Sequence, residues 1–562
     1  MFVSRQLIRR VMPIFIPKKY MKRLLPVFIL VFSLCYTFNY AQVQLEKTNL
    51  PIFSFTLEPG GFLNLETDSP AAYQLRSNGT GKDNTPTDPP VLTGKMGVRY
   101  RGKTSFSLSD KKPYSIEFLD AKGEEQDVPI LGMPAHSDWA LMGPFSDKSL
   151  IREALIYRFG QKISPWAPKY RFVDVIVDGQ YKGIFMLTER IKRNKVRVNI
   201  NKIGTKDTTG QKVTGGYIFA LDKLDPGDIT FRSAFPMPGK TYPPHYRVVY
   251  PNEDDLRPAQ LQYLKDHVRA FERVMDSPGF DDPKEGYAKW IDVPSFVDFV
   301  LLNELSKNVD GYRLSTYFYK DNDAINSKIF AGPIWDFNLA FGNANYCNGQ
   351  YPVGWGYEFN KSCPQDSWVI HFWWEKLIND PAFRVKMKQR WFQLRKSLLS
   401  NGQIMGTIDS LVKVIGPAQD LNFKLYPILN KSVWPNSYVG GSYANEITFL
   451  KNWLDDRLIW LDAVMAEIPD RVSNVAFGEV KVYPNPGRES LTFEYRLAGF
   501  NETAEIYIVD ANGREVYAYS HKFISNGPQI LPLDISQYPT GMYFYRVKPG
   551  NGAPLTGRFV KQ

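Results

Sequence analysis

The sequence predicts an α+β protein in which a large domain of mixed strands and helices precedes a small all-β sandwich. Residues 94–200 show strand-like alternation, and residues 255–468 show mainly helical spacing of apolar side chains. Short strands separated by turns follow from about Ala476. The chain has 562 residues, 43% of them hydrophobic, which is enough for two or three domains with cores of their own.

Residues 1–41 have the features of a secretory signal peptide. Met21-Lys22-Arg23 supplies a short positive start, an apolar run follows at 24–38, and Ala41-Gln42 offers a cleavage point. The run is shorter than the ~20 residues that a membrane-spanning helix needs. We therefore predict an exported protein with no transmembrane segment after signal removal, and Met21 is an alternative start.

The net charge of +11 depends strongly on this signal segment. Residues 1–41 hold seven Lys and Arg residues and no acid, so subtracting seven leaves +4 for residues 42–562. Recognition of nucleic acid needs basic residues concentrated on one face. The sequence therefore predicts no nucleic-acid partner.

Cys347 and Cys363 are the cysteines that remain after signal removal. They lie 16 residues apart in a Gly-, Asn- and Tyr-rich stretch, and an exported protein meets oxidising conditions. A disulfide is expected, with two buried free thiols as the alternative. Zinc is disfavoured because two cysteines without a nearby His pair do not make a tetrahedral site.

The first half of the large domain is predicted to consist mainly of strands. Apolar runs at 50–57 and 62–65 are followed by alternating runs at 96–101 and 114–118. Asp178-Gly179 lies between two further apolar runs and predicts a tight hairpin turn, because Asp and Gly tolerate a positive φ.

The second half is predicted to be mainly helical. After an earlier helix at 148–161, apolar spacing indicates helices at 294–308 and 446–465. Asp292 is the expected N-cap of the middle one and Gly311 its expected stop. Aromatic residues then gather at His371-Phe372-Trp373-Trp374, with Trp355 and Trp368 before them, and at helical spacing they favour a core role.

Two acidic residues stand at related points in the second half. Asp310 follows the helix at 294–308 and Asp336 follows a predicted strand, and a strand and a turn lie between them. This order is expected to bring the two carboxylates together at the mouth of one hairpin. Phosphoryl transfer needs such a pair, one to orient the attacking hydroxyl and one to hold Mg²⁺.

A series of short motifs runs in order from about residue 50 to 465. It includes Tyr100-Arg101-Gly102-Lys103-Thr104-Ser105, Lys111-Lys112-Pro113-Tyr114-Ser115-Ile116, Asp147-Lys148-Ser149-Leu150-Ile151-Arg152, Asp178-Gly179-Gln180-Tyr181-Lys182-Gly183, Leu187-Thr188-Glu189, Asn308-Val309-Asp310 and Trp335-Asp336. The series resembles the CotH (spore coat protein H) family of atypical protein kinases. The resemblance implies a kinase-like fold over residues 42–470 that uses ATP and Mg²⁺ to phosphorylate Ser or Thr of a surface or co-exported protein.

The resemblance also implies roles for particular residues. Asp310 would be the catalytic acid/base, Asp336 would hold the metal, Trp335 would stack on adenine, Arg101 and Lys112 would contact phosphate, and Glu189 would pair with one of these two cations. Asn338 departs from this pattern, because a carboxylate two residues after Asp336 would strengthen metal binding, but its side-chain oxygen can still bind Mg²⁺. The sequence has no G-x-G-x-x-G loop and no HRD or DFG triplet, which excludes an ordinary protein kinase. Ser315 stands where ordinary kinases place a metal-binding Asn.

Residues 476–562 carry a second resemblance. Val482-Tyr483-Pro484-Asn485-Pro486, the strand–turn–strand at 509–516 and Pro539-Thr540-Gly541-Met542-Tyr543 occur in order before the final strand. They resemble the C-terminal sorting domain of the type IX secretion system of Bacteroidetes. This implies export by that machinery, and a location outside the cell or on the outer-membrane surface of a Gram-negative bacterium.

A different functional class is the main alternative. A non-catalytic surface protein could use the same fold to bind a glycan or a protein, and the aromatic residues around Trp373 favour it. The hypothesis of a glycoside hydrolase is supported only by abundant acidic and aromatic residues, because no catalytic carboxylate pair can be placed from the sequence. A serine hydrolase is disfavoured by the lack of G-x-S-x-G.

Overall fold

The computed structural model describes residues 43–237, 243–470, 479–496, 502–523, 529–549 and 553–562. The predicted signal peptide at 1–41 lies outside the described residues. Within them, no helix has the length and apolar character needed to cross a membrane.

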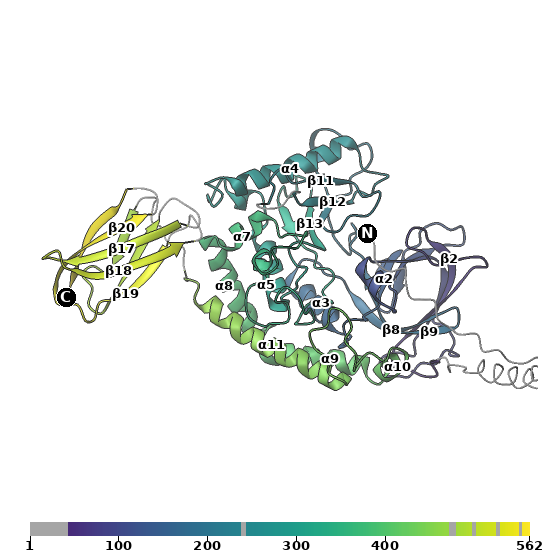
Figure 1. The fold of residues 1–562 in the computed structure, drawn as a ribbon. Helices are drawn as coiled ribbons and strands as arrows, with labels where there is room; N and C mark the ends of the chain where they lie inside the picture. The colour runs from purple at the N-terminus through teal and green to yellow at the C-terminus, as the bar shows by residue number, and fades with distance from the viewer. Residues whose placement is uncertain (1–42, 238–242, 471–478, 497–501, 524–528, 550–552) are drawn as a thin grey trace, which may run out of the picture. The chain divides into compact units, whose positions relative to one another are not determined.

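The first part of the large domain is a closed barrel of seven strands (Figure 1). In order around the barrel, the strands are β1 (Ile52–Leu57), β2 (Ser69–Arg76), β3 (Leu92–Tyr100), β4 (Tyr114–Leu119), β7 (Asp138–Met142), β9 (Gln180–Glu189) and β8 (Tyr170–Val177). β1 pairs with β8 in parallel, and every other neighbouring pair is antiparallel. Aromatic and aliphatic side chains such as Phe53, Tyr73 and Phe185 fill the interior.

The strands predicted in this region are confirmed with one correction. Residues 62–65 form no strand, and Phe62 is 69% exposed. The strand that follows β1 is β2, whose Ala71, Tyr73 and Leu75 alternate inward while the residues between them face out. The turn at Asp178-Gly179 is present, with φ of 49° and 75°.

A second sheet lies in the helical half of the domain. Its strand order is β11 (Thr230–Arg232), β12 (His245–Tyr250), β10 (Tyr217–Leu221), β13 (Thr316–Lys320) and β14 (Ile329–Ala331). The longer helices are α3 (Arg152–Ile163), α4 (Pro258–Asp276), α5 (Val293–Ser306), α8 (Pro381–Arg395), α9 (Asn401–Ile415) and α11 (Tyr443–Ala466). The shorter ones are α2 (Thr104–Leu108), α6 (Phe359–Ser362), α7 (Phe372–Ile378) and α10 (Ala418–Leu425), and a small hairpin pairs β5 (Val128–Ile130) with β6 (Met133–His136).

Helix α5 is the central helix of this half. Its two ends can be compared with the N-cap and the stop that the sequence predicted. The Asp292 carboxylate accepts a hydrogen bond of 2.9 Å from the Ser295 N–H, which confirms the expected cap. The expected stop at Gly311 is wrong. The helix ends at Ser306, because Lys307 adopts a left-handed conformation with φ of 43°. The predicted helix at 148–161 likewise starts later, at Arg152.

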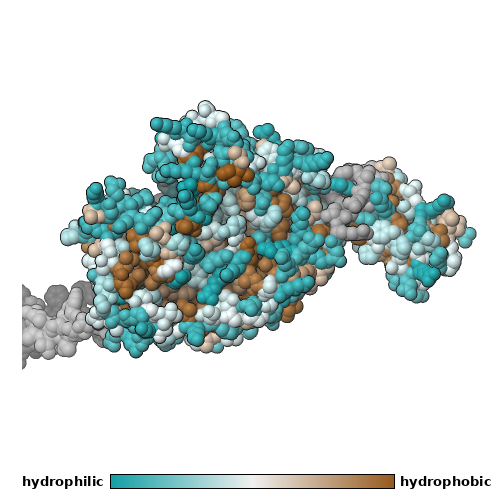
Figure 2. All heavy atoms as spheres, turned by 180° about the vertical axis from the view of Figure 1, so that it is seen from behind, coloured by the Kyte–Doolittle hydropathy of each residue, from teal (hydrophilic) through white to brown (hydrophobic). Residues whose placement is uncertain are grey.

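One large hydrophobic cluster joins the helices, the second sheet and the outer side of strands β8 and β9. The aromatic residues that favoured a surface-binding role lie mostly in it, with Trp373 and Trp374 almost wholly buried and Trp368 37% exposed. Figure 2 shows hydrophobic residues scattered among hydrophilic ones on one face of the molecule, with no single continuous apolar surface there. The core role expected for these aromatics is confirmed for Trp373 and Trp374 but not for Trp368.

The C-terminal part is a sandwich of two antiparallel sheets, as predicted. One sheet contains β15 (Glu479–Tyr483), β16 (Ser490–Arg496) and β19 (Gln529–Asp534). The other contains β18 (Glu515–Phe523), β17 (Glu502–Asp510), β20 (Gly541–Pro549) and β21 (Leu555–Lys561). A separate hydrophobic core, with Phe493 and Ile506 fully buried, lies between the two sheets.

Candidate active site

A pocket between the barrel and the helical half collects most of the residues singled out in the sequence. Arg101, which follows β3, and Trp335, Asp336 and Asn338, which follow β14, all line it. Glu153 of α3 lines it as well. The motifs at 100–105, 147–152 and 335–336 therefore meet at one place.

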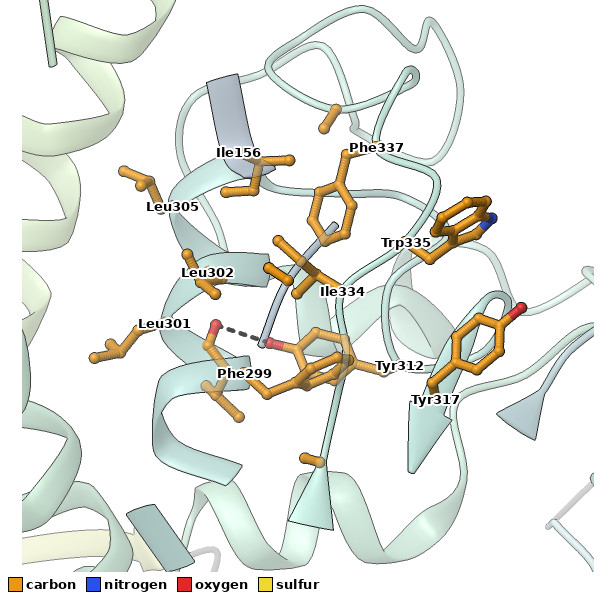
Figure 3. Close-up of a cluster of buried hydrophobic side chains, with 14 of the residues drawn as sticks. Ile156, Phe299, Leu301, Leu302, Leu305, Tyr312, Tyr317, Ile334, Trp335 and Phe337 are labelled. Atoms are coloured by element: carbon orange, nitrogen blue, oxygen red, sulfur yellow. Dashed lines mark hydrogen bonds between the residues drawn. The ribbon is translucent and has the colours of Figure 1, made fainter. Parts of the chain in front are cut away.

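Side chains of the segment around Asp336 point to two opposite sides of the backbone. Figure 3 shows Ile334 and Phe337 on the side of helix α5, whereas Trp335 lies on the opposite side, with Tyr317. Asp336 itself has φ of 65°, which is unusual for a residue with a side chain. Such strained conformations gather at functional sites, because the surrounding packing must hold them in place.

Several carboxylates converge on Asp336. Burial, together with the negative charges of Glu153, Asp310 and Asp222, raises the pKa of Asp336 to about 8, and the Arg101 cation opposes the shift. Sequence reasoning expected Asp310 and Asp336 to lie close together, and the influence of one on the other is consistent with this. The site thus brings several acidic groups close to Asp336, with Arg101 as a cation that favours its charged form.

Glu153 is a site residue that sequence reasoning missed. Its carboxylate accepts a hydrogen bond of 2.6 Å from the Tyr157 hydroxyl. Burial raises its pKa, while the Tyr157 hydroxyl, Arg101 and the Asp336 N–H favour the charged form. The sequence offered one indication of its role, because Glu153 directly follows Arg152, the last residue of the motif at 147–152.

The same motif fixes the start of α3. Asp147 accepts hydrogen bonds from the Arg152 backbone N–H at 2.9 Å and from the Arg152 guanidinium at 2.6 Å. Ser149 also donates its hydroxyl to Asp147, at 2.6 Å. Asp147 and Arg152 are almost fully buried, so this ion pair anchors the first turn of α3 and positions Glu153 in the pocket.

Asp310 lies in the segment that connects α5 to β13, and its side chain is 19% exposed. The Arg313 guanidinium donates to its carboxylate at 2.8 Å and stacks over the Phe359 ring at 3.9 Å. The connecting segment includes Tyr312 and Ser315 at φ of 68° and 46°, both left-handed. A partly exposed carboxylate on a strained, well-anchored segment is accessible to a substrate.

The predicted disulfide is present close to this segment. Cys347 and Cys363 are bonded, with their Cα atoms 5.3 Å apart. Asn308, Val309 and Cys347 line one pocket, which places the disulfide beside the chain that leads into Asp310.

Arg101 is the main cation of the site. Its guanidinium lies over the Trp335 ring at 5.3 Å from the ring centre and donates to the Met142 sulfur at 3.0 Å. Burial and the nearby Arg190 lower the pKa of Arg101 to about 10, so it is charged at neutral pH. Trp335 is 7% exposed, and the structure thus places a cation on the ring that was expected to stack on adenine.

Two predicted site residues lie elsewhere. The Lys112 ammonium donates to the Phe106 carbonyl and lies over the Phe106 ring. Glu189 is fully buried in the barrel wall and accepts a hydrogen bond of 2.9 Å from the Lys169 N–H. The described residues show no ion pair of Glu189 with Arg101 or Lys112, so the expected pairing is absent from this structure.

The acidic residues of the site can be compared with the ligands that Mg²⁺ takes in proteins. Among the described residues, no group of three His, Cys, Asp or Glu side chains has the spacing of a preformed metal site. Mg²⁺ retains several waters and takes only one or two protein carboxylates, with substrate phosphates as further ligands. Asp336 and Glu153, with the amide of Asn338, fit that requirement, because burial, with nearby carboxylates, raises the pKa values of both acids and a cation would favour their charged forms.

Two family models match parts of the chain. A family model described as CotH kinase protein matches residues 98–461, well over half of the chain. The chain belongs to this family. A second model, described as a secretion system C-terminal sorting domain, matches residues 481–562. No curated protein matches the chain.

The two matches confirm the combination expected from the motifs. This CotH-family protein carries a kinase-like domain followed by a type IX sorting domain, and the sorting domain indicates export to the cell surface or the extracellular space. Arg101, Glu153, Asp310, Trp335 and Asp336 all fall within the part that matches the CotH model.

Proposed function

We propose that this protein is an exported atypical protein kinase that transfers the γ-phosphate of ATP to Ser or Thr of a surface or co-exported protein. The observation that carries the proposal is the convergence of Asp336, Glu153 and Asp310 beside Arg101. Carboxylates suit a magnesium ion and an attacking hydroxyl, and a buried guanidinium suits phosphate oxygens. Membership of the CotH kinase family supports the same reading.

Each residue has a proposed part in the reaction. Asp336, with Glu153 and Asn338, would hold Mg²⁺, which when bound neutralises phosphate charge. Asp310 would accept a hydrogen bond from the acceptor hydroxyl and take its proton as that oxygen bonds to the γ-phosphorus and the bond from the γ-phosphorus to the bridging oxygen breaks, releasing ADP. Arg313 would hold the Asp310 carboxylate in position through its 2.8 Å contact.

Arg101 is proposed to bind phosphate oxygens of the nucleotide. Its stacking on Trp335 keeps the guanidinium in the pocket, and the planar group can form two parallel hydrogen bonds with an anion. In this arrangement Trp335 contributes by orienting Arg101, in addition to the adenine contact that the family resemblance implies.

Calorimetry of nucleotide binding tests the proposal. Residues 42–562 would be titrated with ATP, with and without Mg²⁺, and compared with Asp336→Asn. Binding that requires Mg²⁺ and is lost in Asp336→Asn is expected. A matched control is Glu285→Gln, which removes one charge from a side chain that is 74% exposed and paired only with Lys289 at 2.6 Å among the described residues.

Loss of phosphoryl transfer in Asp310→Asn, with nucleotide binding kept, would assign the acid/base role. If folded wild-type protein binds no ATP at millimolar concentration, the kinase proposal is wrong. The CotH fold would then serve a binding role on the cell surface.

A further inference from the structure

A second cavity, of about 810 Å³, lies between the barrel and helix α9 and shares no lining residue with the candidate active site. Arg158 of α3, Arg171 of β8 and Lys413 of α9 line it. Among its described lining residues there is no Asp or Glu. We call this cavity the basic cleft.

Among the residues that the structure describes, the three cations of the basic cleft have no carboxylate partner within ion-pair distance. Within the ranges that the structure describes, none of the three forms an ion pair. Arg158 donates instead to the Tyr170 hydroxyl at 3.2 Å and to the Ser410 hydroxyl at 3.1 Å. Arg171 donates to the Tyr170 carbonyl at 2.7 Å and acts on the pKa of the buried Glu189 carboxyl only at longer range.

This concentration of like charge is unusual in a chain whose charge is nearly balanced over residues 42–562. Like charges that share a cleft repel one another, although solvent screens this repulsion where the side chains are exposed. A bound anion would relieve it. Arg158 is also preorganised, because its two hydroxyl partners hold the guanidinium in one position before any ligand arrives.

The rest of the lining is apolar or exposes backbone. Leu50 and Phe172 are buried at the cavity wall, and Val414 is 41% exposed beside Lys413. Gly79 and Gly81 have φ of 95° and 74°, and nothing lies within 4 Å of the position that a Cβ would take on either one. The loop that carries them therefore presents bare backbone to the cleft.

We propose that the basic cleft binds an acidic peptide segment of a partner protein. Its Asp or Glu carboxylates would pair with Arg158, Arg171 and Lys413, and an apolar side chain of the same segment would contact Val414. A peptide supplies carboxylates and apolar groups in one chain, which matches a lining of both kinds better than a small anion does. This interaction is independent of phosphoryl transfer.

Fluorescence anisotropy tests the proposal with a short labelled peptide of alternating Glu and Leu, and with the same peptide carrying Gln in place of Glu. The protein is the chain of residues 42–562. The Glu peptide is expected to bind at least about tenfold more tightly than the Gln peptide. Its affinity is expected to fall as the salt concentration is raised. The double variant Arg171→Glu/Lys413→Glu changes two exposed side chains of the cleft and is expected to lose at least about tenfold in affinity.

Lys424→Glu is the matched control, because Lys424 is exposed on the neighbouring helix α10 and does not line the cleft. It should bind the Glu peptide like the unchanged protein. Equal binding by the double variant and this control, both with wild-type thermal melting, would overturn the proposal. So would failure of the Glu peptide to bind, or its displacement by inorganic phosphate at low millimolar concentration, which would assign the cleft to a phosphate group instead.

Discussion

Glu304 and Arg457 form an ion pair of 3.1 Å with neither side chain exposed to solvent. Glu304 comes from α5 and Arg457 from α11. The Glu304 carboxylate also accepts the Gly356 N–H at 2.7 Å, the Tyr357 N–H at 3.0 Å and the Tyr312 hydroxyl at 2.9 Å. Because Tyr312 belongs to the segment that carries Asp310, this pair ties the candidate catalytic residue to the two helices.

Arg457→Met is expected to lower the free energy of unfolding by about 3–5 kcal/mol, because it leaves the Glu304 charge buried without its cation. Tryptophan fluorescence during urea unfolding measures this. The chain has no Trp after Trp460, so the signal reports on the kinase-like domain and not on the sandwich.

Lys289→Met is the control for this change. Lys289 is 51% exposed and pairs with Glu285, so its loss should cost only about 0–1 kcal/mol. Equal destabilisation by the two variants would show that the buried pair is not a main support of the fold. Glu304→Gln combined with Arg457→Met should recover part of the loss, because the uncompensated charge is removed.

The prediction that Asp310 and Asp336 lie close together depends on local elements, because each residue follows one. Helix α5, β13 and β14 each show their own periodicity, and the β13–β14 hairpin brings the ends together. Glu153 was missed because its approach depends on long-range packing. Nothing in the local pattern indicates that α3 packs against α5 or that its first turn faces Asp336.

Closure of the barrel could not be predicted for the same reason. It depends on parallel pairing between residues 52–55 and 174–177, more than 100 residues apart in the chain. Glu189 illustrates the consequence. The family resemblance implied that it pairs with Arg101 or Lys112, but barrel closure buries it in the wall, where the Lys169 backbone N–H is its partner.

Removal of the disulfide is expected to destabilise the kinase-like domain by about 3 kcal/mol. The bond closes a loop with a sequence separation of 16 residues, and loop-closure entropy gives this magnitude. The variant Cys347→Ser/Cys363→Ser, measured by thermal melting without reductant, checks it. Melting of the unchanged protein should shift toward that of the variant when dithiothreitol is added, and the variant itself should not respond.

Glu153→Gln is expected to weaken Mg²⁺-dependent ATP binding by about 10–100-fold, the usual loss when a carboxylate that supports a metal site is removed. The Gln side chain can still accept the hydrogen bond that Tyr157 donates at 2.6 Å, so the fold should persist. Calorimetry with ATP and Mg²⁺ measures the change. Unaltered affinity would remove Glu153 from the proposed metal site while leaving Asp336 in it.

Because the Lys111 ammonium is buried, we predict that the free energy of unfolding depends on pH. Its buried ammonium donates to the Asn422 side chain at 2.7 Å, and burial lowers the pKa of Lys111 from 10.5 to about 7, while Asp174 opposes the shift. Between pH 7 and pH 10.5 the unfolded chain therefore binds more protons at this residue than the folded one. Stability should rise with pH across that window, by up to about 5 kcal/mol for this one group.

Lys111→Met removes that titration, so its free energy of unfolding should change less between pH 7 and pH 10 than that of the unchanged protein. Asn422 keeps the Ile184 N–H as a donor at 3.1 Å, so α10 should stay docked on β9. Lys112→Met is the control, because Lys112 is only partly buried. Urea unfolding followed by tryptophan fluorescence at several pH values measures the slope. An equal slope in Lys111→Met and in the unchanged protein would mean that the Lys111 ammonium keeps its charge throughout the window, against the expected effect of its burial.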